Sequence, residues 1–346
     1  MNRRHFLGAS TAAAVLASAT ATAAPARPSG RLKVIVPVLE PAALADLKDV
    51  AAGLDLVECR SQAEAIEQAP GAAASYGFIT RELIRAGTSL KWVQQTSAGV
   101  EHLMEIPELV QGDIVLTNMQ RAYAPEIADQ ALGYLLAFTR GLAHFILTQS
   151  SHQWRSRQPG VVLDELMGKT LLVIGLGGIG TEIARRAQAF GMRVLATDPK
   201  VLERPLYVEE LHRPDAFHQL LPRADVVASA VPLTKQSLRM IGAREFALMK
   251  RGVVLINVSR GKVVDTEALV AALDSGQVAA AGLDVTDPEP LPKDHPLWSR
   301  HAIITPHSAG QSPGGERRRH ELFRENLRRF AAGEMLLNVV DKKVGY

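Results

Sequence analysis

Short apolar runs alternate with amphipathic segments along the chain from residue 32 onward. After residue 168 the runs are continuous, as in Leu171–Ile174 and Val253–Ile256, which is typical of central parallel strands buried on both faces. Further runs of this kind stand at residues 194–196, 226–228, 281–283 and 303–304. They recur roughly every 20–30 residues, which leaves room for a crossover helix in each gap. This part is therefore predicted to form a six-stranded, doubly wound sheet of the dinucleotide-binding type.

The preceding part shows the same alternation in shorter pieces. A helix is predicted over Pro41–Val50, because proline is tolerated in a first turn. Short strands are predicted at residues 34–36, 54–57, 76–79, 91–95 and 114–116. The expected fold class is therefore α/β, with two domains that each contain a parallel sheet.

Two apolar-faced segments need separate interpretation. Ala131–Leu147 is interrupted by Arg140 and His144, so a long buried or interface helix is expected rather than a membrane span. The segment from Arg317 to Arg329 contains six arginines, but its apolar residues fall on one helical face. A packed helix with a solvated basic face is expected there, and not a partner-binding helix.

Composition narrows the function classes. The 346 residues are 47% hydrophobic and 22% charged, which fits two globular domains. The single cysteine, Cys59, excludes a disulfide framework and a multi-cysteine zinc site, and no metal site is expected. Removing residues 1–23, which hold Arg3 and Arg4 and no acidic residue, lowers the net charge by two, from +3 to +1. The charge is thus no argument for a nucleic-acid partner.

The N-terminus has the three parts of an export signal. Arg3 and Arg4 precede a mildly apolar stretch over residues 11–24, and Ala21-Thr22-Ala23 offers a cleavage site. Paired arginines followed by Phe-Leu resemble the bacterial twin-arginine signal. Residues 1–24 are therefore expected to be a signal peptide that directs a periplasmic protein with no membrane anchor in its mature form. The alternative is a disordered tail on a cytoplasmic protein.

A glycine loop follows the first strong apolar run. Gly175-Leu176-Gly177-Gly178-Ile179-Gly180 has the pattern G-x-G-x-x-G between a predicted strand and a predicted helix. Gly175 permits the tight turn, Gly177 lets the backbone approach a pyrophosphate, and Gly180 allows close helix packing. Asp198 ends the next strand at the spacing expected of the acid that holds the ribose hydroxyls. NAD is favoured over NADP because Asp198 repels a 2′-phosphate, although Lys200 nearby keeps NADP possible.

Three later strands end in polar residues. Arg260 follows the fourth run, Glu289 lies in the loop after the fifth, and His307 follows the sixth. The carboxyl ends of parallel strands meet at one edge, so the fold brings these residues together. A guanidinium can bind the carboxylate of a 2-oxo acid with two donors. An imidazole held by a carboxylate can exchange a proton with the carbonyl oxygen. Each residue alone is open to an ordinary structural reading, and only the set at successive strand ends favours catalysis.

Taken together, the motifs resemble the D-isomer-specific 2-hydroxyacid dehydrogenases. The resemblance covers most of the chain after residue 30 and includes the glycine loop with Asp198. The other matching segments are residues 90–94, 97–102, 231–234, 257–261, 282–290, 305–307, 325–330 and 338–340.

This resemblance implies roles for particular residues. His307 would be the acid/base, Glu289 its partner and Arg260 the substrate anchor. The backbone N–H groups of Ala98, Gly99 and Val100 would hold the substrate carboxylate. The cofactor would be lined by Gly178, Ile179, Asp198, Thr234, Val258, Ser259 and Asp284.

The resemblance also implies an architecture. Residues 31–125 and 311–346 would form a flavodoxin-like substrate domain, with a Rossmann domain at 126–310 inserted. Long helices over Ile127–Gln149 and Pro313–Ala332 would cross between them. A homodimer through the cofactor domain is expected, with Trp154 in the segment that wraps the partner.

The predicted function is therefore NAD(P)-dependent interconversion of a small 2-oxo acid and its D-2-hydroxy acid. Glu101 stands where the family usually has Asp, which keeps the charge. The segment Tyr76–Thr80 has no basic residue before Arg81, so glyoxylate, hydroxypyruvate or another short 2-oxo acid is favoured over a phosphorylated substrate. The alternatives are a non-catalytic, dinucleotide-gated binding protein on the same fold and, less favoured, an enzyme of alanine dehydrogenase type.

Overall fold

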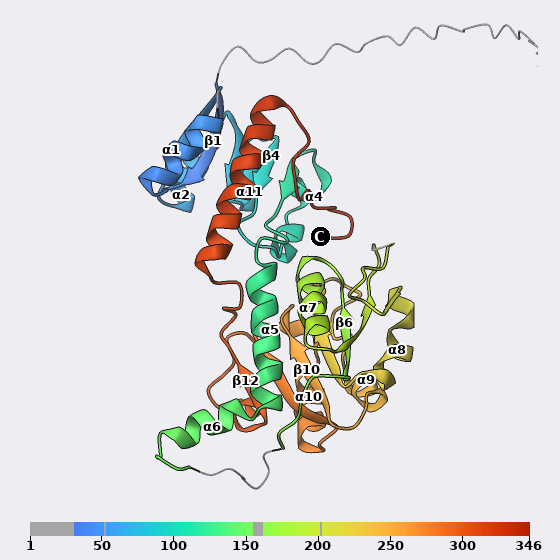
Figure 1. The fold of residues 1–346 in the computed structure, drawn as a ribbon. Helices are drawn as coiled ribbons and strands as arrows, with labels where there is room; N and C mark the ends of the chain where they lie inside the picture. Colours follow the sequence, from blue (N-terminus) through green and yellow to red (C-terminus); the bar gives the residue numbers. More distant parts are fainter. Residues whose placement is uncertain (1–30, 52, 155–161, 201–202) are drawn as a thin grey trace, which may run out of the picture.

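The computed structural model describes residues 31–51, 53–154, 162–200 and 203–346 (Figure 1). The proposed signal peptide, residues 1–24, lies outside the described residues. The chain forms two lobes, each with an all-parallel sheet, which we call the five-stranded lobe and the seven-stranded lobe. The predicted α/β class with two doubly wound parallel sheets is confirmed.

The five-stranded lobe contains the early part of the chain. Its sheet has the order β2-β1-β3-β4-β5, which is the flavodoxin-like order. The strands are β1 (Leu32–Pro37), β2 (Leu54–Cys59), β3 (Ala72–Tyr76), β4 (Trp92–Gln94) and β5 (Val115–Thr117). The helices between them are α1 (Pro41–Val50), α2 (Gln62–Gln68), α3 (Arg81–Ala86) and α4 (Pro107–Gln111).

One predicted strand in this lobe was wrong. Of the segment 76–79 only Tyr76 belongs to a strand, because β3 begins four residues earlier, at Ala72, and ends at Tyr76. Three alanines have little intrinsic preference for a strand, and only their burial in the sheet makes them one. Gly77, which follows the strand, has a φ of +80°, and the Ser75 hydroxyl donates to the Phe78 carbonyl at 2.7 Å across this bend.

The C-terminal helix returns to the five-stranded lobe. Helix α11 (Pro313–Ala332) lies beside α1 and β4 in Figure 1. Its buried Phe323 stacks on Tyr76 with ring centroids 3.9 Å apart, and Leu327 packs in the same core as Trp92. This burial attaches α11 to the five-stranded lobe, although the two are far apart in the sequence. The exact domain limits stay a prediction.

The seven-stranded lobe has the order β12-β11-β10-β9-β6-β7-β8. Its strands are β6 (Thr170–Ile174), β7 (Arg193–Thr197), β8 (Glu210–His212), β9 (Val226–Ser229), β10 (Val253–Asn257), β11 (Val278–Leu283) and β12 (Ala302–Ile304). Its helices are α7 (Gly178–Ala189), α8 (Phe217–Leu220), α9 (Ala243–Leu248) and α10 (Thr266–Asp274). Strand order reverses between β6 and β9, and such switch points open a binding crevice at the carboxyl ends of the strands.

Strand β8 was missed by the sequence analysis. It has only three residues, half-buried, and two of them are Glu210 and His212. It pairs in parallel with β7, and ion pairs Arg193–Glu209 and Arg223–Glu210 hold this edge. A strand that is neither apolar nor alternating gives no periodic signal.

The single long helix expected around residues 127–149 is two helices. Gly141, with a φ of +60°, separates α5 (Ala124–Thr139) from α6 (Leu142–Gln149), and the two axes differ by 72°. Helix α5 is buried along the face that carries Ala128, Leu132 and Leu135. Among the described residues no single helix is long and apolar enough to span a membrane, and this bent pair meets that test only by length and composition.

Candidate active site

An imidazole and a carboxylate lie together at the carboxyl edge of the seven-stranded sheet. Nδ1 of His307 is 2.7 Å from Oε1 of Glu289. A carboxylate only accepts hydrogen bonds, so Nδ1 carries the hydrogen and Nε2 is left to exchange a proton with a ligand. Both side chains are partly open, with 46% of His307 and 41% of Glu289 exposed. The pair is therefore formed and also reachable by a small molecule.

Asp284 holds the turn that carries His307. This buried residue follows β11, and its carboxylate accepts from the Thr305 hydroxyl at 2.6 Å and from the N–H groups of Ser308 and Ala309. The N–H of His307 donates to the Asp284 carbonyl at 2.8 Å. His307 has a φ of +53°, a conformation that costs energy and persists because surrounding contacts impose it. The strand ends β11 and β12 thus set the direction of the imidazole.

Arg260 is positioned in a similar way by the end of β10. The buried Asn257 accepts from the N–H and the hydroxyl of Ser259, at 3.1 and 2.7 Å. Its amide nitrogen donates to the carbonyl of Arg260 at 3.0 Å. This closed turn projects the Arg260 side chain out of the sheet edge.

The Arg260 guanidinium reaches across to the five-stranded lobe. Its Nε lies 2.7 Å from Oε1 of Glu101, and both side chains are about a quarter to a third exposed. The approach to the loop before Glu101 is close enough that a Cβ on Gly99 would lie 1.7 Å from an Arg260 nitrogen. The Arg260–Glu101 pair therefore joins the two lobes across the site.

The loop Ser97–Val100 offers backbone donors toward the same place. The carbonyls of Ala98 and Gly99 accept from the side chains of Asn118 and Ser97, at 2.7 and 2.9 Å. Within the described part of the chain, the N–H groups of Ala98, Gly99 and Val100 donate to no protein acceptor. Consecutive free N–H groups form an anion-binding concavity.

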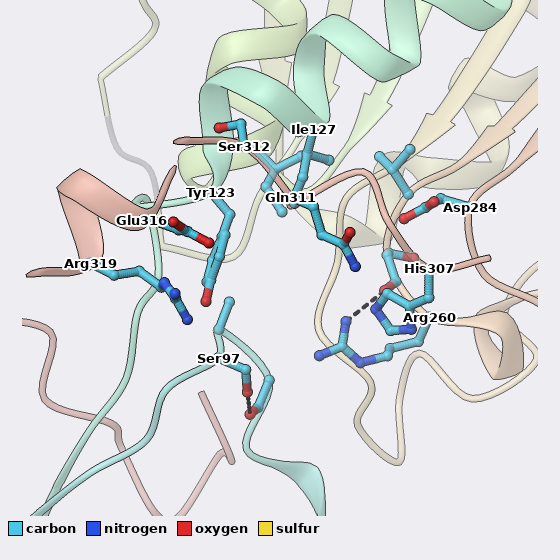
Figure 2. Close-up of a pocket in the computed structure, with 16 residues that line it drawn as sticks. Ser97, Tyr123, Ile127, Arg260, Asp284, His307, Gln311, Ser312, Glu316 and Arg319 are labelled. Carbon is cyan, nitrogen blue, oxygen red and sulfur yellow. Dashed lines mark hydrogen bonds between the residues drawn. The ribbon is translucent and has the colours of Figure 1, made fainter. Parts of the chain in front are cut away.

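These groups surround one cavity of about 350 Å³ between the lobes, shown in Figure 2. Of the predicted site residues, those that line it are Ala98, Gly99, Ile179, Val258, Ser259, Arg260, Asp284 and His307. Glu289 contacts His307 but does not itself line the cavity. The side chain of Val100 is buried in the five-stranded lobe, so only its backbone could serve. Thr234 does not line the cavity, and its N–H donates to the Ser237 hydroxyl at 2.8 Å.

The glycine loop lies beside this cavity at the start of α7. Gly175 has a φ of +89°, and a Cβ on Gly180 would lie 1.8 Å from the Gly175 carbonyl oxygen, so both positions require glycine. At Gly177, by contrast, an added Cβ would meet no atom within 4 Å. Open space beside a helix N-terminus with free N–H groups fits a pyrophosphate. Residues Gly175–Gly180 therefore fit a dinucleotide.

Asp198 closes the outer end of that loop. Its carboxylate is buried and accepts from the N–H groups of Leu176 and Lys200, at 2.8 and 2.7 Å. The Lys200 ammonium lies 4.0 Å from the ring centre of Tyr346, which the C-terminal segment brings in from the other lobe. Asp198 thus stands at the place where ribose hydroxyls bind in such folds.

Several residues around the cavity escaped the sequence analysis. Glu101 was noted only as a conservative departure, whereas it forms the ion pair with Arg260. Arg319 was counted with the solvated face of a packed helix, whereas it lines the cavity. Other lining residues that were not predicted are Ser97, Tyr123, Ile127, Gly310, Gln311, Ser312 and Glu316. Only contacts between the lobes identify them. Among the described residues, no cluster of three potential metal ligands occurs.

A glycine loop that fits a dinucleotide, beside an imidazole–carboxylate pair and a guanidinium, defines a dinucleotide-dependent oxidoreductase site. Comparison with known proteins shows which family of oxidoreductases the chain belongs to. Residues 132–309 match the family model described as D-isomer specific 2-hydroxyacid dehydrogenase, NAD binding domain.

Relatives with assigned names support the same family. A glyoxylate reductase of Korarchaeum cryptofilum is 35% identical over 272 residues, which cover 77% of this chain and 80% of that protein. A D-3-phosphoglycerate dehydrogenase of Methanocaldococcus jannaschii is 32% identical over 265 residues, and the chain spans only half of its length. A D-isomer specific 2-hydroxyacid dehydrogenase of Xanthobacter autotrophicus, solved with NADPH and MES, superposes with a TM-score of 0.76 at 27% identity and covers 92% and 100% of the two chains.

The chain belongs to the D-isomer specific 2-hydroxyacid dehydrogenase family. Its activity class is NAD(P)-dependent oxidation and reduction at a CH–OH group.

Proposed function

We propose that the protein interconverts a short 2-oxo acid and its D-2-hydroxy acid, with His307 as acid/base, Glu289 as its partner and Arg260 as substrate anchor. The observation that carries the proposal is the 2.7 Å contact between His307 and Glu289 on the edge of the cavity that Arg260 also lines. Relatives named glyoxylate reductase and hydroxypyruvate reductase support this substrate class.

Each residue has a task that its position supports. Arg260 and the N–H groups of Ala98 and Gly99 bind the substrate carboxylate, because both present donors to one end of the cavity. When bound, the nicotinamide would supply a hydride to the carbonyl carbon of the 2-oxo acid or accept one from C2 of the 2-hydroxy acid. His307 gives a proton from Nε2 to the developing alkoxide, and in the reverse direction it takes that proton from the hydroxyl. Glu289 keeps Nδ1 protonated and holds the ring in this orientation.

Substitution of His307 tests the proposal. His307→Ala is expected to lower kcat for glyoxylate by about 10³-fold, because a general acid/base contributes that much, while the Kd for NADH changes less than about threefold. His301→Ala is the matched control, since this exposed histidine precedes the same strand, contacts the Ala279 carbonyl and the Phe138 ring, and does not line the cavity. Turnover by His307→Ala within a few fold of the parent would refute the assigned role.

The rival function is a dinucleotide-gated binding protein without catalysis. The intact set of Arg260, Glu289 and His307 weighs against it. Oxidation of NADH, followed at 340 nm (the usual wavelength) against a panel of 2-oxo acids, separates the two. Tight NADH binding without turnover of any of them would favour the rival.

We also propose that NAD is preferred over NADP, although relatives of this fold have been solved with NADPH or NADP. The buried carboxylate of Asp198 supports this preference, because it would repel a 2′-phosphate. Asp198→Ala is expected to narrow the ratio of kcat/KM between NADH and NADPH by about tenfold or more. An unchanged ratio would contradict the assignment.

A homodimer through the seven-stranded lobe is proposed on the basis of exposed apolar residues. Helix α6 exposes Ile146 and Leu147 by 66% and 73%, and Trp154 just after it is 99% exposed. Large apolar side chains that are this exposed and lie close together in the chain are typical of protein–protein interfaces. Light scattering of Leu147→Glu and Trp154→Glu is expected to report monomers, and an unchanged mass would oppose this interface.

Export by the twin-arginine route is proposed from residues 1–24, which lie outside the described residues. Fractionation of cells should place the protein in the periplasm, and Arg3→Lys with Arg4→Lys should retain it in the cytoplasm. A cytoplasmic parent protein would favour the alternative. Extraction of nucleotide from the purified protein would show whether it carries its cofactor with it.

A further inference from the structure

The part of the cavity farthest from His307 is built by helix α11. Arg319 and Glu316 line it, together with Tyr123 from the start of α5. Figure 2 shows Arg319 on the other side of Tyr123 from His307 and Arg260, with its guanidinium directed toward the hydroxyl end of that ring. The Tyr123 hydroxyl donates to the Thr96 carbonyl at 2.6 Å, which fixes the ring between the two ends.

Arg319 differs from most other arginines of α11. Arg318 pairs with Glu126, Arg324 with Asp46, and both Arg328 and Arg329 with Glu325. Arg319 forms no ion pair with any described residue, and its Nε is buried without a hydrogen-bond partner among them. Its partner is Tyr123, whose ring centre lies 5.7 Å from the guanidinium carbon and whose hydroxyl forms a hydrogen bond with the guanidinium.

A buried donor without a partner costs free energy, so the unpaired Nε of Arg319 favours a ligand that accepts a hydrogen bond. Burial lowers the pKa of Arg319, while Tyr123, Tyr76 and Glu316 raise it, and the net direction is upward. The guanidinium is therefore charged throughout the physiological range. The fold thus places a cation at the cavity that has the Tyr123 hydroxyl as a hydrogen-bond partner, an unpaired Nε and no ion pair with a described carboxylate.

We propose that the substrate carries a second carboxylate beyond C3, which Arg319 binds while Arg260 binds the 2-oxo acid end. The protein would thus act on 2-oxo dicarboxylic acids of four or five carbons. This inference rests on the proposed function of the site. A carboxylate is favoured over a phosphate because Glu316 lines the same end of the cavity and would repel a dianion more strongly than a monoanion.

Arg81, the first basic residue after Tyr76–Thr80, forms an ion pair away from the cavity. Nε of Arg81 lies 3.2 Å from a carboxylate oxygen of Glu108 on the surface of the five-stranded lobe. The distal cation comes instead from a helix more than 230 residues later in the chain. The expectation of a short 2-oxo acid in place of a phosphorylated one depended on that loop, so it did not take this helix into account.

The test compares 2-oxo acids that differ only at the distal end. 2-Oxoglutarate is paired with 2-oxopentanoate, and oxaloacetate with 2-oxobutyrate. The parent protein is expected to show kcat/KM at least about tenfold higher for each dicarboxylate, mainly through KM, because both ends are then bound by guanidinium groups.

Variants at the distal end should change this preference in opposite directions. Arg319→Met is expected to lower kcat/KM for the dicarboxylates by about 30-fold and to leave the monocarboxylates within about threefold, with partial rescue by Arg319→Lys. Glu316→Gln is expected to raise the preference for dicarboxylates a few fold, because one repulsive charge is gone. Arg317→Met is the matched control, since this neighbouring arginine is exposed and does not line the cavity.

The outcomes separate this inference from the proposed function. Turnover of glyoxylate and the monocarboxylates without preference for dicarboxylates would overturn the inference and leave the proposed function standing. An equal loss for both members of a pair in Arg319→Met would also overturn it. Better turnover of a 3-phosphooxy-2-oxo acid than of 2-oxoglutarate would overturn the choice of a carboxylate.

If no 2-oxo acid is turned over, the proposed function fails. The distal carboxylate site is then tested by measuring the binding of 2-oxo acids instead of their turnover. 2-Oxoglutarate and 2-oxopentanoate are then titrated calorimetrically into the complex with NAD⁺, in which reduction cannot occur. Preferential binding of 2-oxoglutarate that is lost in Arg319→Met supports the distal site. Equal binding of the two acids overturns it.

Discussion

The glycine loop Gly175–Gly180 and the loop Ser97–Val100 both border the site. The first is closely approached by backbone atoms, and the second by side-chain atoms. A Cβ on Gly180 would lie 1.8 Å from a backbone carbonyl oxygen, which has no freedom to move. A Cβ on Gly99 would lie 1.7 Å from the end of the Arg260 side chain and 2.6 Å from that of Glu101, both of which can rotate. The cofactor end of the site is therefore built from backbone, and the substrate end from side chains that meet across the lobes.

This difference has a functional consequence. The backbone of a buried parallel sheet fixes the dinucleotide site within one lobe. The substrate end depends on how the two lobes lie relative to each other, because Arg260 and Glu101 come from different lobes. Substitutions that crowd the backbone in the first region are expected to act on folding, and those that displace the side chains in the second on substrate affinity.

The largest effect is expected at Gly180. Gly180→Ala should reduce the free energy of unfolding by about 3 kcal/mol or abolish soluble expression, because helix α7 must move away from β6. Urea denaturation measures this. Gly177→Ala is the matched control within the loop, since its Cβ would meet no protein atom. That variant should keep its stability and lose affinity for NADH, and a stable Gly180→Ala variant would refute the backbone account.

The next effect concerns the core of the five-stranded lobe. The buried Asn326 donates to Gln94 and Leu337, and accepts from the N–H of Leu337 at 2.7 Å. Asn326→Leu should cost about 2–4 kcal/mol of unfolding free energy, because buried polar groups lose their partners. Glu321→Gln on the exposed face of the same helix serves as control. A loss below about 1 kcal/mol would show that the lobe tolerates the unpaired groups.

Gly99→Ala should affect binding more than stability. The added methyl group displaces the Arg260 guanidinium from Glu101, so KM for the substrate is expected to rise about tenfold while the unfolding free energy changes by less than about 1 kcal/mol. Steady-state kinetics and denaturation are measured on the same preparation. A variant that loses stability but keeps its KM would contradict the view that only side chains restrict the loop Ser97–Val100.

The smallest effect is expected at the edge strand β8. Arg223 and His212 hold the pKa of Glu210 at about 2, below its ordinary 4.5. The folded state therefore gains stability from this carboxylate above about pH 4.5, and loses it as the pH falls toward 2. Glu210→Gln should cost less than about 1 kcal/mol at pH 7, because the pair is partly exposed, and the cost should shrink with acid. Urea denaturation at several pH values measures it, and a cost that grows with acid would contradict the sign.

Sequence patterns by themselves determined the strands that are buried on both faces and the residues at their ends. Continuous apolar runs located β6, β7, β9 and β10, because burial on two sides admits hardly any polar residue. Glycine spacing located the dinucleotide loop, since a close approach of backbone to backbone excludes every other side chain. The same reasoning predicted that Arg260, Glu289 and His307 lie together, because the carboxyl ends of parallel strands meet at one edge of the sheet.

The tertiary structure alone decided what depends on distant partners. The alanines of β3 become a strand through burial, and the charged residues of β8 through ion pairs at the edge. Gly141 divides a largely apolar segment into α5 and α6 by its backbone conformation. Arg319 resembles its neighbours on α11 in sequence, and only the packing of that helix directs its charge into the cavity rather than toward a carboxylate. Periodicity reports the solvent exposure of a residue, whereas these features depend on which other segment lies opposite.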